Sequence, residues 1–137
     1  MARCLVVNVK AEQGESPVYV KECNELQDFY DAIKAEPFDI AVCNVGGRNF
    51  DFFVDDEGLF EDNPIPSVMD AHFKALLVGN VVIANHDNEG NTTDLSDDDI
   101  RLIMANIEWL GIKQAGSDDF RLVPVIVNAD YPVYERR

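Results

Sequence analysis

Short runs of apolar or alternating residues, each bounded by turn-forming residues, predict a β-sheet along much of the chain. Residues 3–9 and 17–22 have this pattern, and the polar turn between them predicts an opening hairpin. Residues 39–44 and 49–55 predict a second hairpin, because the paired glycines between them supply the positive φ angles of a tight connection. Further strands are predicted at 80–85 and 121–127.

Helical periodicity appears in three other places. Residues 24–35 carry apolar side chains every three or four positions, which predicts a helix with one buried face. Residues 97–110 predict the second main helix, since Ser96 and Asp99 have the spacing of an N-terminal capping box. Residues 68–77 predict a short third helix that ends at a glycine.

These elements together predict one α+β domain over residues 1–137, with an antiparallel or mixed sheet of about five to six strands. Two main helices and one short helix complete the expected fold. Residues 55–67 predict a long acidic loop, because Pro64 and Pro66 argue against regular structure there.

Two large apolar residues lie off the buried face of the helix predicted at 97–110. Leu102 and Trp109 are seven positions apart and form a second stripe that needs a partner. The last strand, or the tail at 131–134, is expected to cover it. The alternative is an apolar interface for self-association or for a target, with Trp109 as its anchor.

The charge of the chain indicates which classes of partner it favours and which it disfavours. The chain has 26 acidic and 11 basic residues, which gives a formal net charge of −15. Between residues 49 and 100 there are thirteen acids, and Lys74 is the only base. Such a field disfavours direct binding of nucleic acids and attracts basic protein surfaces. The alternative is a solvated face that only keeps the protein soluble. The acids predicted to form a protein-binding surface are Asp55, Asp56, Glu57, Glu61, Asp62, Asp87, Glu89, Asp94, Asp97 and Asp98.

Metal and cofactor motifs are not recognisable in the sequence. Cys4, Cys23 and Cys43 are odd in number and widely spaced, so we expect free thiols and no metal site. Residues 85–96 imitate the first half of a calcium-binding loop, but Ser96 cannot supply the bidentate carboxylate at position twelve. A polar turn before a capped helix explains this segment better. We therefore predict no cofactor.

Enzymatic chemistry has little support in the pattern. His72 and His86 are candidate general bases, but no recognisable serine or cysteine nucleophile motif accompanies either of them. No glycine-rich phosphate loop precedes a helix. No catalytic residue is assigned, and an enzyme remains the least favoured class.

The chain contains no apolar run near the roughly 20 residues that span a bilayer. Its first residues turn polar at Asn8 and do not resemble a secretion signal. We expect a cytoplasmic protein without membrane contact.

Three sequence blocks carry a resemblance to a known family. They are Asp55-Asp56-Glu57-Gly58-Leu59-Phe60, then residues 77–85, and then residues 94–100 after an acidic turn. Over residues 3–108 the chain resembles a family of small, uncharacterised proteins common on bacteriophages, plasmids and other mobile elements, classified as a domain of unknown function. The resemblance implies a mobile-element origin, and so a host cytoplasm if the gene is phage-encoded. It supplies no catalytic residues.

Three functional hypotheses follow. The first is a non-enzymatic binding protein whose acidic surface engages a basic host protein, in the manner of a DNA-mimicking inhibitor of nucleic-acid-binding or defence proteins. The second is a small-molecule or nucleotide-binding, sequestering protein, for which Arg48, Lys74 and Arg101 are the scattered positive groups. The third is an uncharacterised enzyme. A homo-oligomer is compatible with each of them.

Overall fold

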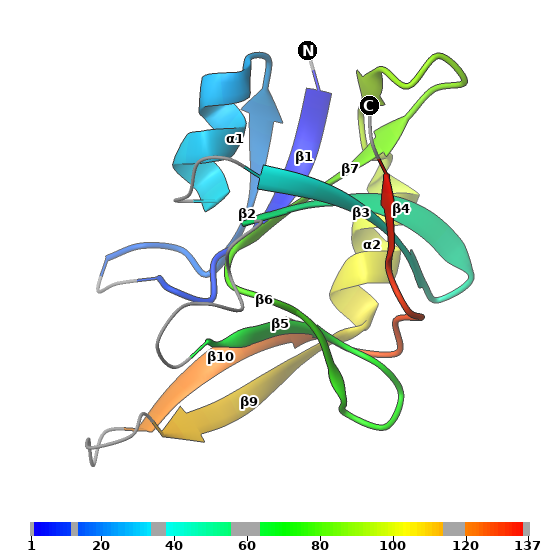
Figure 1. Ribbon diagram of the computed structural model, residues 1–137. Coiled ribbons are helices and arrows are strands. Elements are labelled where there is room, and N and C mark those ends of the chain that lie inside the picture. The colour runs from blue at the N-terminus through cyan, green and yellow to red at the C-terminus, as the bar shows by residue number, and fades with distance from the viewer. Residues whose placement is uncertain (1, 12–13, 34–37, 56–63, 114–119, 136–137) are drawn as a thin grey trace.

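The computed structural model describes residues 2–11, 14–33, 38–55, 64–113 and 120–135 (Figure 1). Within these residues the chain folds into two β-sheets and two helices, so the fold is mostly β within the expected α+β class. A single sheet was expected, and the presence of a second one corrects that expectation. Neither helix is long and apolar enough to cross a membrane.

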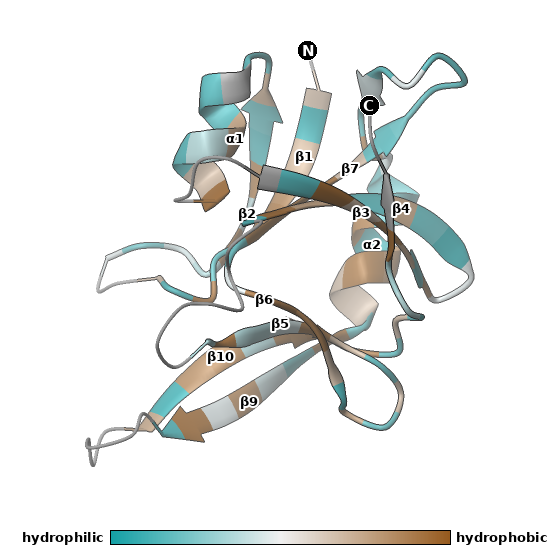
Figure 2. Cartoon of the chain, in the orientation of Figure 1, coloured by the Kyte–Doolittle hydropathy of each residue, from teal (hydrophilic) through white to brown (hydrophobic). Residues whose placement is uncertain are grey.

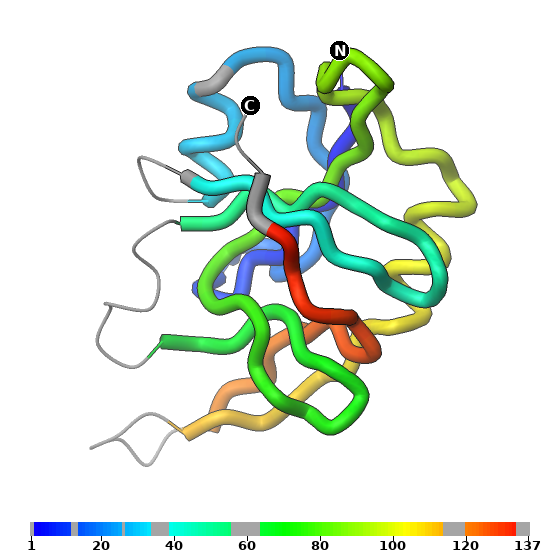
Figure 3. The backbone as a smooth tube through the Cα atoms, turned by 45° about the vertical axis from the view of Figure 1, so that its right-hand side comes forward, coloured from blue at the N-terminus to red at the C-terminus, as the bar shows by residue number. Residues whose placement is uncertain are grey.

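The first sheet has the strand order β11-β3-β4-β7-β1-β2, and the short strand β8 pairs with β7. All of its pairings are antiparallel. Both predicted hairpins are confirmed, since β1 pairs with β2 and β3 pairs with β4. Figure 3 shows β11 running along the free side of β3. The strands are β1 (Ala2–Val7), β2 (Val18–Cys23), β3 (Phe38–Val45), β4 (Arg48–Asp55), β7 (Val81–His86), β8 (Thr92–Thr93) and β11 (Val133–Glu135).

The second sheet has the strand order β6-β5-β10-β9. β10 pairs antiparallel with β9 along its whole length, but it meets β5 in parallel only where Ile126 lies opposite Val68. The first half of β10 therefore extends beyond β5, toward the connection between β1 and β2 (Figure 1). The strands are β5 (Pro66–Met69), β6 (Ala75–Val78), β9 (Ile107–Lys113) and β10 (Phe120–Ile126).

Two hydrophobic clusters hold these layers together. Helix α1 (Leu26–Ile33) covers one face of the first sheet, where Phe29 packs against Phe53 with ring centroids 4.4 Å apart. The opposite face packs against the second sheet and helix α2 (Asp97–Ala105), with Phe52 and Ile103 fully buried between them. Figure 2 shows the matching pattern, with brown stretches along the middle of the strands and teal at the β7–β8 turn.

The prediction of a short helix at 68–77 is wrong, because these residues form the β5–β6 hairpin. The Asp70 side chain accepts hydrogen bonds from the backbone N–H groups of His72 and Lys74, which closes a turn in the middle of the predicted helix. Short apolar runs have no decisive period, so pairing with a neighbouring strand decides between helix and strand.

The second main helix is shorter than predicted. It ends at Ala105, and residues 107–113 continue as β9, whose alternating side chains match the register of β10. Gly111, which follows the predicted end of this helix, lies in β9. Of the acidic loop predicted at 55–67, residues 56–63 lie outside the described residues, and Pro66 begins β5.

The β5–β6 turn contains a strained residue. Phe73 has a φ angle of 61° and is 59% exposed, so a bulky side chain occupies a left-handed conformation while burying little surface. We expect Phe73→Gly to raise the free energy of unfolding by about 0.5–1 kcal/mol, because relief of strain outweighs the added backbone entropy. Urea denaturation measures this change. Ala71→Gly in the same turn is the control and should destabilise, and equal effects of the two substitutions would contradict the strain.

Candidate functional site

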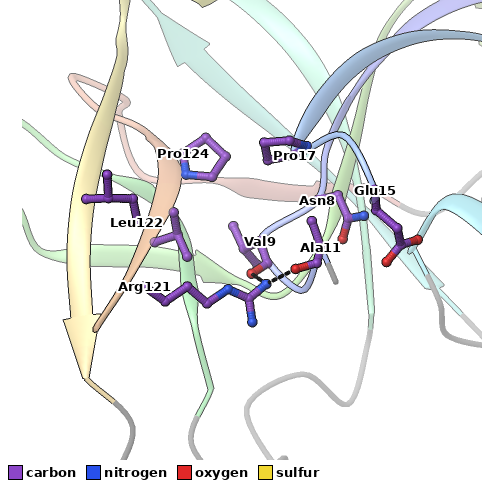
Figure 4. A pocket seen from close by; sticks show the side chains of 9 residues that line it. Asn8, Val9, Ala11, Glu15, Pro17, Arg121, Leu122 and Pro124 are labelled. Carbon is purple, nitrogen blue, oxygen red and sulfur yellow. Dashed lines mark hydrogen bonds between the residues drawn. The ribbon is translucent and has the colours of Figure 1, made fainter. Parts of the chain in front are cut away.

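A cleft opens between the two sheets, where the β1–β2 connection faces the first half of β10 (Figure 4). We call it the inter-sheet cleft. Its volume is about 260 Å³. The walls combine apolar and polar side chains from chain segments far apart in the sequence. The lining residues are Asn8, Val9, Ala11, Glu15, Pro17, Arg121, Leu122, Val123 and Pro124.

Asn8 is a buried polar residue that lines this cleft. It directly follows β1, and its backbone N–H donates to the carbonyl oxygen of Pro17 at 2.7 Å, which fixes its position. The side chain is only 3% exposed, yet the amide oxygen Oδ1 accepts no hydrogen bond. A buried acceptor without a donor costs about 1–3 kcal/mol, so a ligand or water that donates to it gains that free energy.

Arg121 provides the positive charge of the cleft. It extends from β10, and its Nη2 donates to the carbonyl oxygens of Val9 at 2.8 Å and Ala11 at 2.6 Å (Figure 4). These bonds connect the second sheet to the β1–β2 connection and hold the guanidinium in place. They use only part of its five N–H donors.

A second cavity adjoins the first. It has a volume of about 370 Å³ and is lined by Asn8, Glu15, Ser16 and Tyr19. Since both cavities share Asn8 and Glu15, a ligand in the inter-sheet cleft can extend toward the ring of Tyr19. The first cavity alone lies at the small end of ligand-binding sites, which favours a small molecule.

The structure brings together part of the predicted acidic surface. Asp87 and Glu89 lie in the β7–β8 turn, and Asp94, Asp97 and Asp98 follow along the start of α2. All five residues are exposed. They form one continuous stretch of chain, which we call the acidic stretch.

The remaining predicted acids do not join this group within the described residues. Asp55 lies at the opposite end of the β4–β7 ladder, because Asp51 lies opposite Ala84 and Val54 lies opposite Val81. At about 3.3 Å per residue, this places Asp55 roughly 20 Å from the β7–β8 turn. Four other acids lie outside the described residues: Asp56, Glu57, Glu61 and Asp62.

Arginines lie among the acids of α2. Arg3 pairs with Asp97 at 3.0 Å, and Arg101 pairs with Asp98 at 3.0 Å. The aspartate side chains remain 75% and 73% exposed in these pairs, so the contacts are weak surface ion pairs. They reduce the negative charge of the acidic stretch without burying it.

The predicted capping box of α2 is confirmed. Ser96 accepts from the backbone N–H of Asp99, and Asp99 accepts from the backbone N–H of Ser96. Asp99 also accepts from Asn85 at 2.9 Å and pairs with Arg48 at 2.9 Å. Burial raises the pKa of Asp99, but these hydrogen bonds outweigh it and hold that pKa below its usual range.

Because the folded-state pKa of Asp99 is lowered, its contribution to stability is present above about pH 4 and is lost as the pH falls through the folded pKa. We expect Asp99→Asn to lower the free energy of unfolding by about 1 kcal/mol at pH 7, and by less at pH 3. Urea denaturation at both pH values measures the difference. Asp98→Asn removes the same charge from an exposed side chain and is the control. A cost for Asp99→Asn that does not change with pH would count against the carboxylate's role.

The two histidines have different surroundings. Nδ1 of His86 lies 2.9 Å from Oδ1 of Asp51, which is fully buried in β4. His72 is exposed in the β5–β6 turn, beside a cavity of about 300 Å³ that Asp70 and Asp130 also line. A hydrogen bond of 2.6 Å from Lys74 Nζ to the hydroxyl of Tyr131 lies at the same end of the molecule.

All three cysteines are free and buried. Burial raises the pKa of Cys43 to about 12, which keeps this thiol protonated and unreactive. Cys4 and Cys23 are neighbours, and their mutual hydrogen bond raises the pKa of Cys4 and lowers that of Cys23. Among the described residues, no three His, Cys, Asp or Glu side chains are close enough to hold a metal ion.

The predicted apolar stripe is divided between two elements. Leu102 lies on α2 and is half-buried against the core. Trp109 lies on β9 and is 51% exposed, although β10 pairs beside it. The strand of the tail, β11, pairs with β3. The prediction that Leu102 and Trp109 form one helical stripe is therefore wrong, and Trp109 is an exposed aromatic residue of the second sheet.

Asn8 and Arg121, which line the inter-sheet cleft, were not among the site residues predicted from the sequence. Both residues stand within or directly after apolar strands, and a polar side chain in such a position is the sequence signal that could have indicated them. The positive groups considered instead were Arg48, Lys74 and Arg101, and none of them lines the inter-sheet cleft.

Comparison with known proteins gives one family and no close relative. No curated protein matches the chain, and no solved structure matches it. A family model described as a domain of unknown function (DUF3846) matches residues 7–108, which is most of the chain. The matched segment contains Asn8 but ends before Arg121. The chain belongs to the DUF3846 family.

Proposed function

We propose that the protein is a non-enzymatic binding protein that holds a small polar ligand in the inter-sheet cleft. The buried, unpartnered Oδ1 of Asn8 carries this proposal, because a folded protein rarely leaves such an acceptor unsatisfied. The cleft also joins an amide, a guanidinium and a carboxylate to apolar walls, a combination typical of ligand sites.

Native mass spectrometry of the gently purified protein tests this proposal, and we expect a bound small molecule that denaturation releases. Ala11→Phe places a ring in the cleft and should abolish the added mass. Ala75→Phe adds the same ring to an exposed position on β6 and should not. Retention of the ligand by Ala11→Phe would place the site elsewhere.

A second candidate function rests on the acidic stretch. Its five exposed acids support a proposal that the protein also engages a basic protein surface. The mobile-element origin implied by the sequence resemblance suggests a host protein in the cytoplasm, and imitation of DNA is the proposed mode. Displacement of DNA from a basic host protein at low salt tests it. Competition that is absent at low salt, or unchanged at high salt, would refute it.

A further inference from the structure

We propose that the ligand of the inter-sheet cleft is a small oxyanion that also carries an N–H or O–H donor. In this arrangement Arg121 binds the anionic group and Asn8 Oδ1 accepts from the donor. The inference rests on the proposed function and names the ligand class for that site.

The charge of Arg121 is the first argument. Arg3, Arg48 and Arg101 each pair with an aspartate, so Arg121 is the one arginine in the described part of the chain without a carboxylate partner. The carbonyl oxygens of Val9 and Ala11 orient its guanidinium but cannot neutralise it. The Glu15 carboxylate also lines the cleft, but Arg121 forms no ion pair with a described residue. In a protein with a net charge of −15, a cleft-lining arginine outside any ion pair is a specific feature.

The donors left on Arg121 give the second argument. Both contacts use Nη2, so the N–H groups of Nε and Nη1 have no acceptor among the described residues. Oxyanions are the ligands that guanidinium groups bind best, through charge-assisted hydrogen bonds. Because the guanidinium is already positioned, little side-chain entropy is lost when an anion binds.

Asn8 specifies the other end of the ligand. Its Oδ1 can only accept, so it selects a ligand that presents an N–H or O–H group. Apolar side chains of Val9, Pro17 and Leu122 line the same cleft and suit a short hydrocarbon body. The volume of about 260 Å³ suits a small ligand, and the second cavity gives room for a longer one.

Matched probes test the inference on the wild-type protein. N-acetylglycine supplies a carboxylate and an N–H group, N-acetylglycinamide lacks the charge, and N-acetylsarcosine lacks the N–H group. We expect each loss to weaken binding about tenfold or more. None of these probes contains an aromatic ring, so the fluorescence of Trp109, the only tryptophan, serves as the signal of binding. Trp109 lies opposite the cleft residue Pro124 in the β9–β10 ladder. Isothermal titration calorimetry gives the affinities independently.

The source of the oxyanion is distinguished in a parallel arm. Inorganic phosphate and acetate are titrated under the same conditions, at equal ionic strength. Tighter binding of phosphate assigns the site to phosphorylated ligands, and tighter binding of acetate assigns it to carboxylates. Either result supports the oxyanion, whereas failure of all the anionic probes to bind overturns it.

Two variants assign the residues. Arg121→Gln should reduce the affinity for N-acetylglycine about tenfold or more, whereas Arg101→Gln, which removes the same charge from an exposed ion pair on α2, should not. Asn8→Ala should remove the preference for N-acetylglycine over N-acetylsarcosine. If a variant does not fold, the probe series on the wild-type protein still tests whether the ligand needs a negative charge and a hydrogen-bond donor.

Failure of the oxyanion inference and failure of the proposed binding site give different experimental results. N-acetylglycinamide that binds as tightly as N-acetylglycine overturns the oxyanion while the cleft remains a binding site. A native ligand that Ala11→Phe does not displace overturns the cleft itself.

Discussion

A Gly46→Ala variant should lose roughly 2–4 kcal/mol of unfolding free energy, because one added methyl group meets both a backbone and a packing constraint. Gly46 has a φ angle of 61°, which is unfavourable for alanine. An added Cβ would lie 2.7 Å from Cδ1 of Leu102 and 3.2 Å from Nδ2 of Asn106. The β3–β4 turn is therefore packed directly against α2. Urea denaturation, followed by circular dichroism, measures the loss.

Two comparisons separate the causes. Gly47→Ala also places alanine at a positive φ angle, but its Cβ would meet no atom within 4 Å, so it reports backbone strain alone. In a Leu102→Ala background, the packing part of the Gly46→Ala cost should fall to the smaller contact with Asn106. If that background leaves the cost of Gly46→Ala unchanged, the turn and the helix are not in contact.

His86→Ala should destabilise the protein by roughly 2–4 kcal/mol, because it removes a hydrogen-bond partner from a buried carboxylate. Asp51 is 0% exposed, and both of its oxygens lie within 3.1 Å of Nδ1 of His86. Thermal and urea denaturation at pH 7 measure the change.

His72 provides the matched control for this prediction. Its side chain is exposed, and its backbone N–H, which donates to Asp70, is kept in an alanine variant. We expect His72→Ala to change stability by less than about 0.5 kcal/mol. Similar costs for the two histidine variants would mean that the contact between His86 and Asp51 contributes nothing.

The local pattern predicted most of the first sheet because its hairpins are close in sequence. The β3–β4 turn, for example, is determined by two adjacent glycines between apolar strands, a signal that needs no distant contact. The start of α2 was predictable for the same reason, since Ser96 and Asp99 form the capping box between themselves.

The errors occur where pairing with a distant strand decides the structure. Residues 107–113 continue the spacing of α2 and also alternate as a strand, and the register with β10 selects the strand. Residues 68–77 form a local hairpin, and the other side of β5 pairs with the distant strand β10. Local propensity cannot settle such segments, because the stabilising partner lies elsewhere in the chain.

The inter-sheet cleft was beyond sequence reasoning for a related reason. Asn8 and Arg121 come from opposite ends of the chain and meet only because the two sheets pack together. The acidic stretch was easier to predict, since its members are neighbours in sequence. Asp55 shows the limit of charge counting, because the β4–β7 register places it far from the acidic stretch.

The position of β1 inside the first sheet has a consequence for how the chain acquires its structure during synthesis. β1 lies between β2 and β7. Its edge toward β2 can pair early, because β2 follows directly in the sequence. Its other edge can pair only after residues 81–86, which form β7, have left the ribosome. The second sheet waits longer still, since β9 and β5 are joined through β10. The nascent chain therefore exposes unpaired apolar edges for much of translation, the state in which folding intermediates are most prone to aggregate.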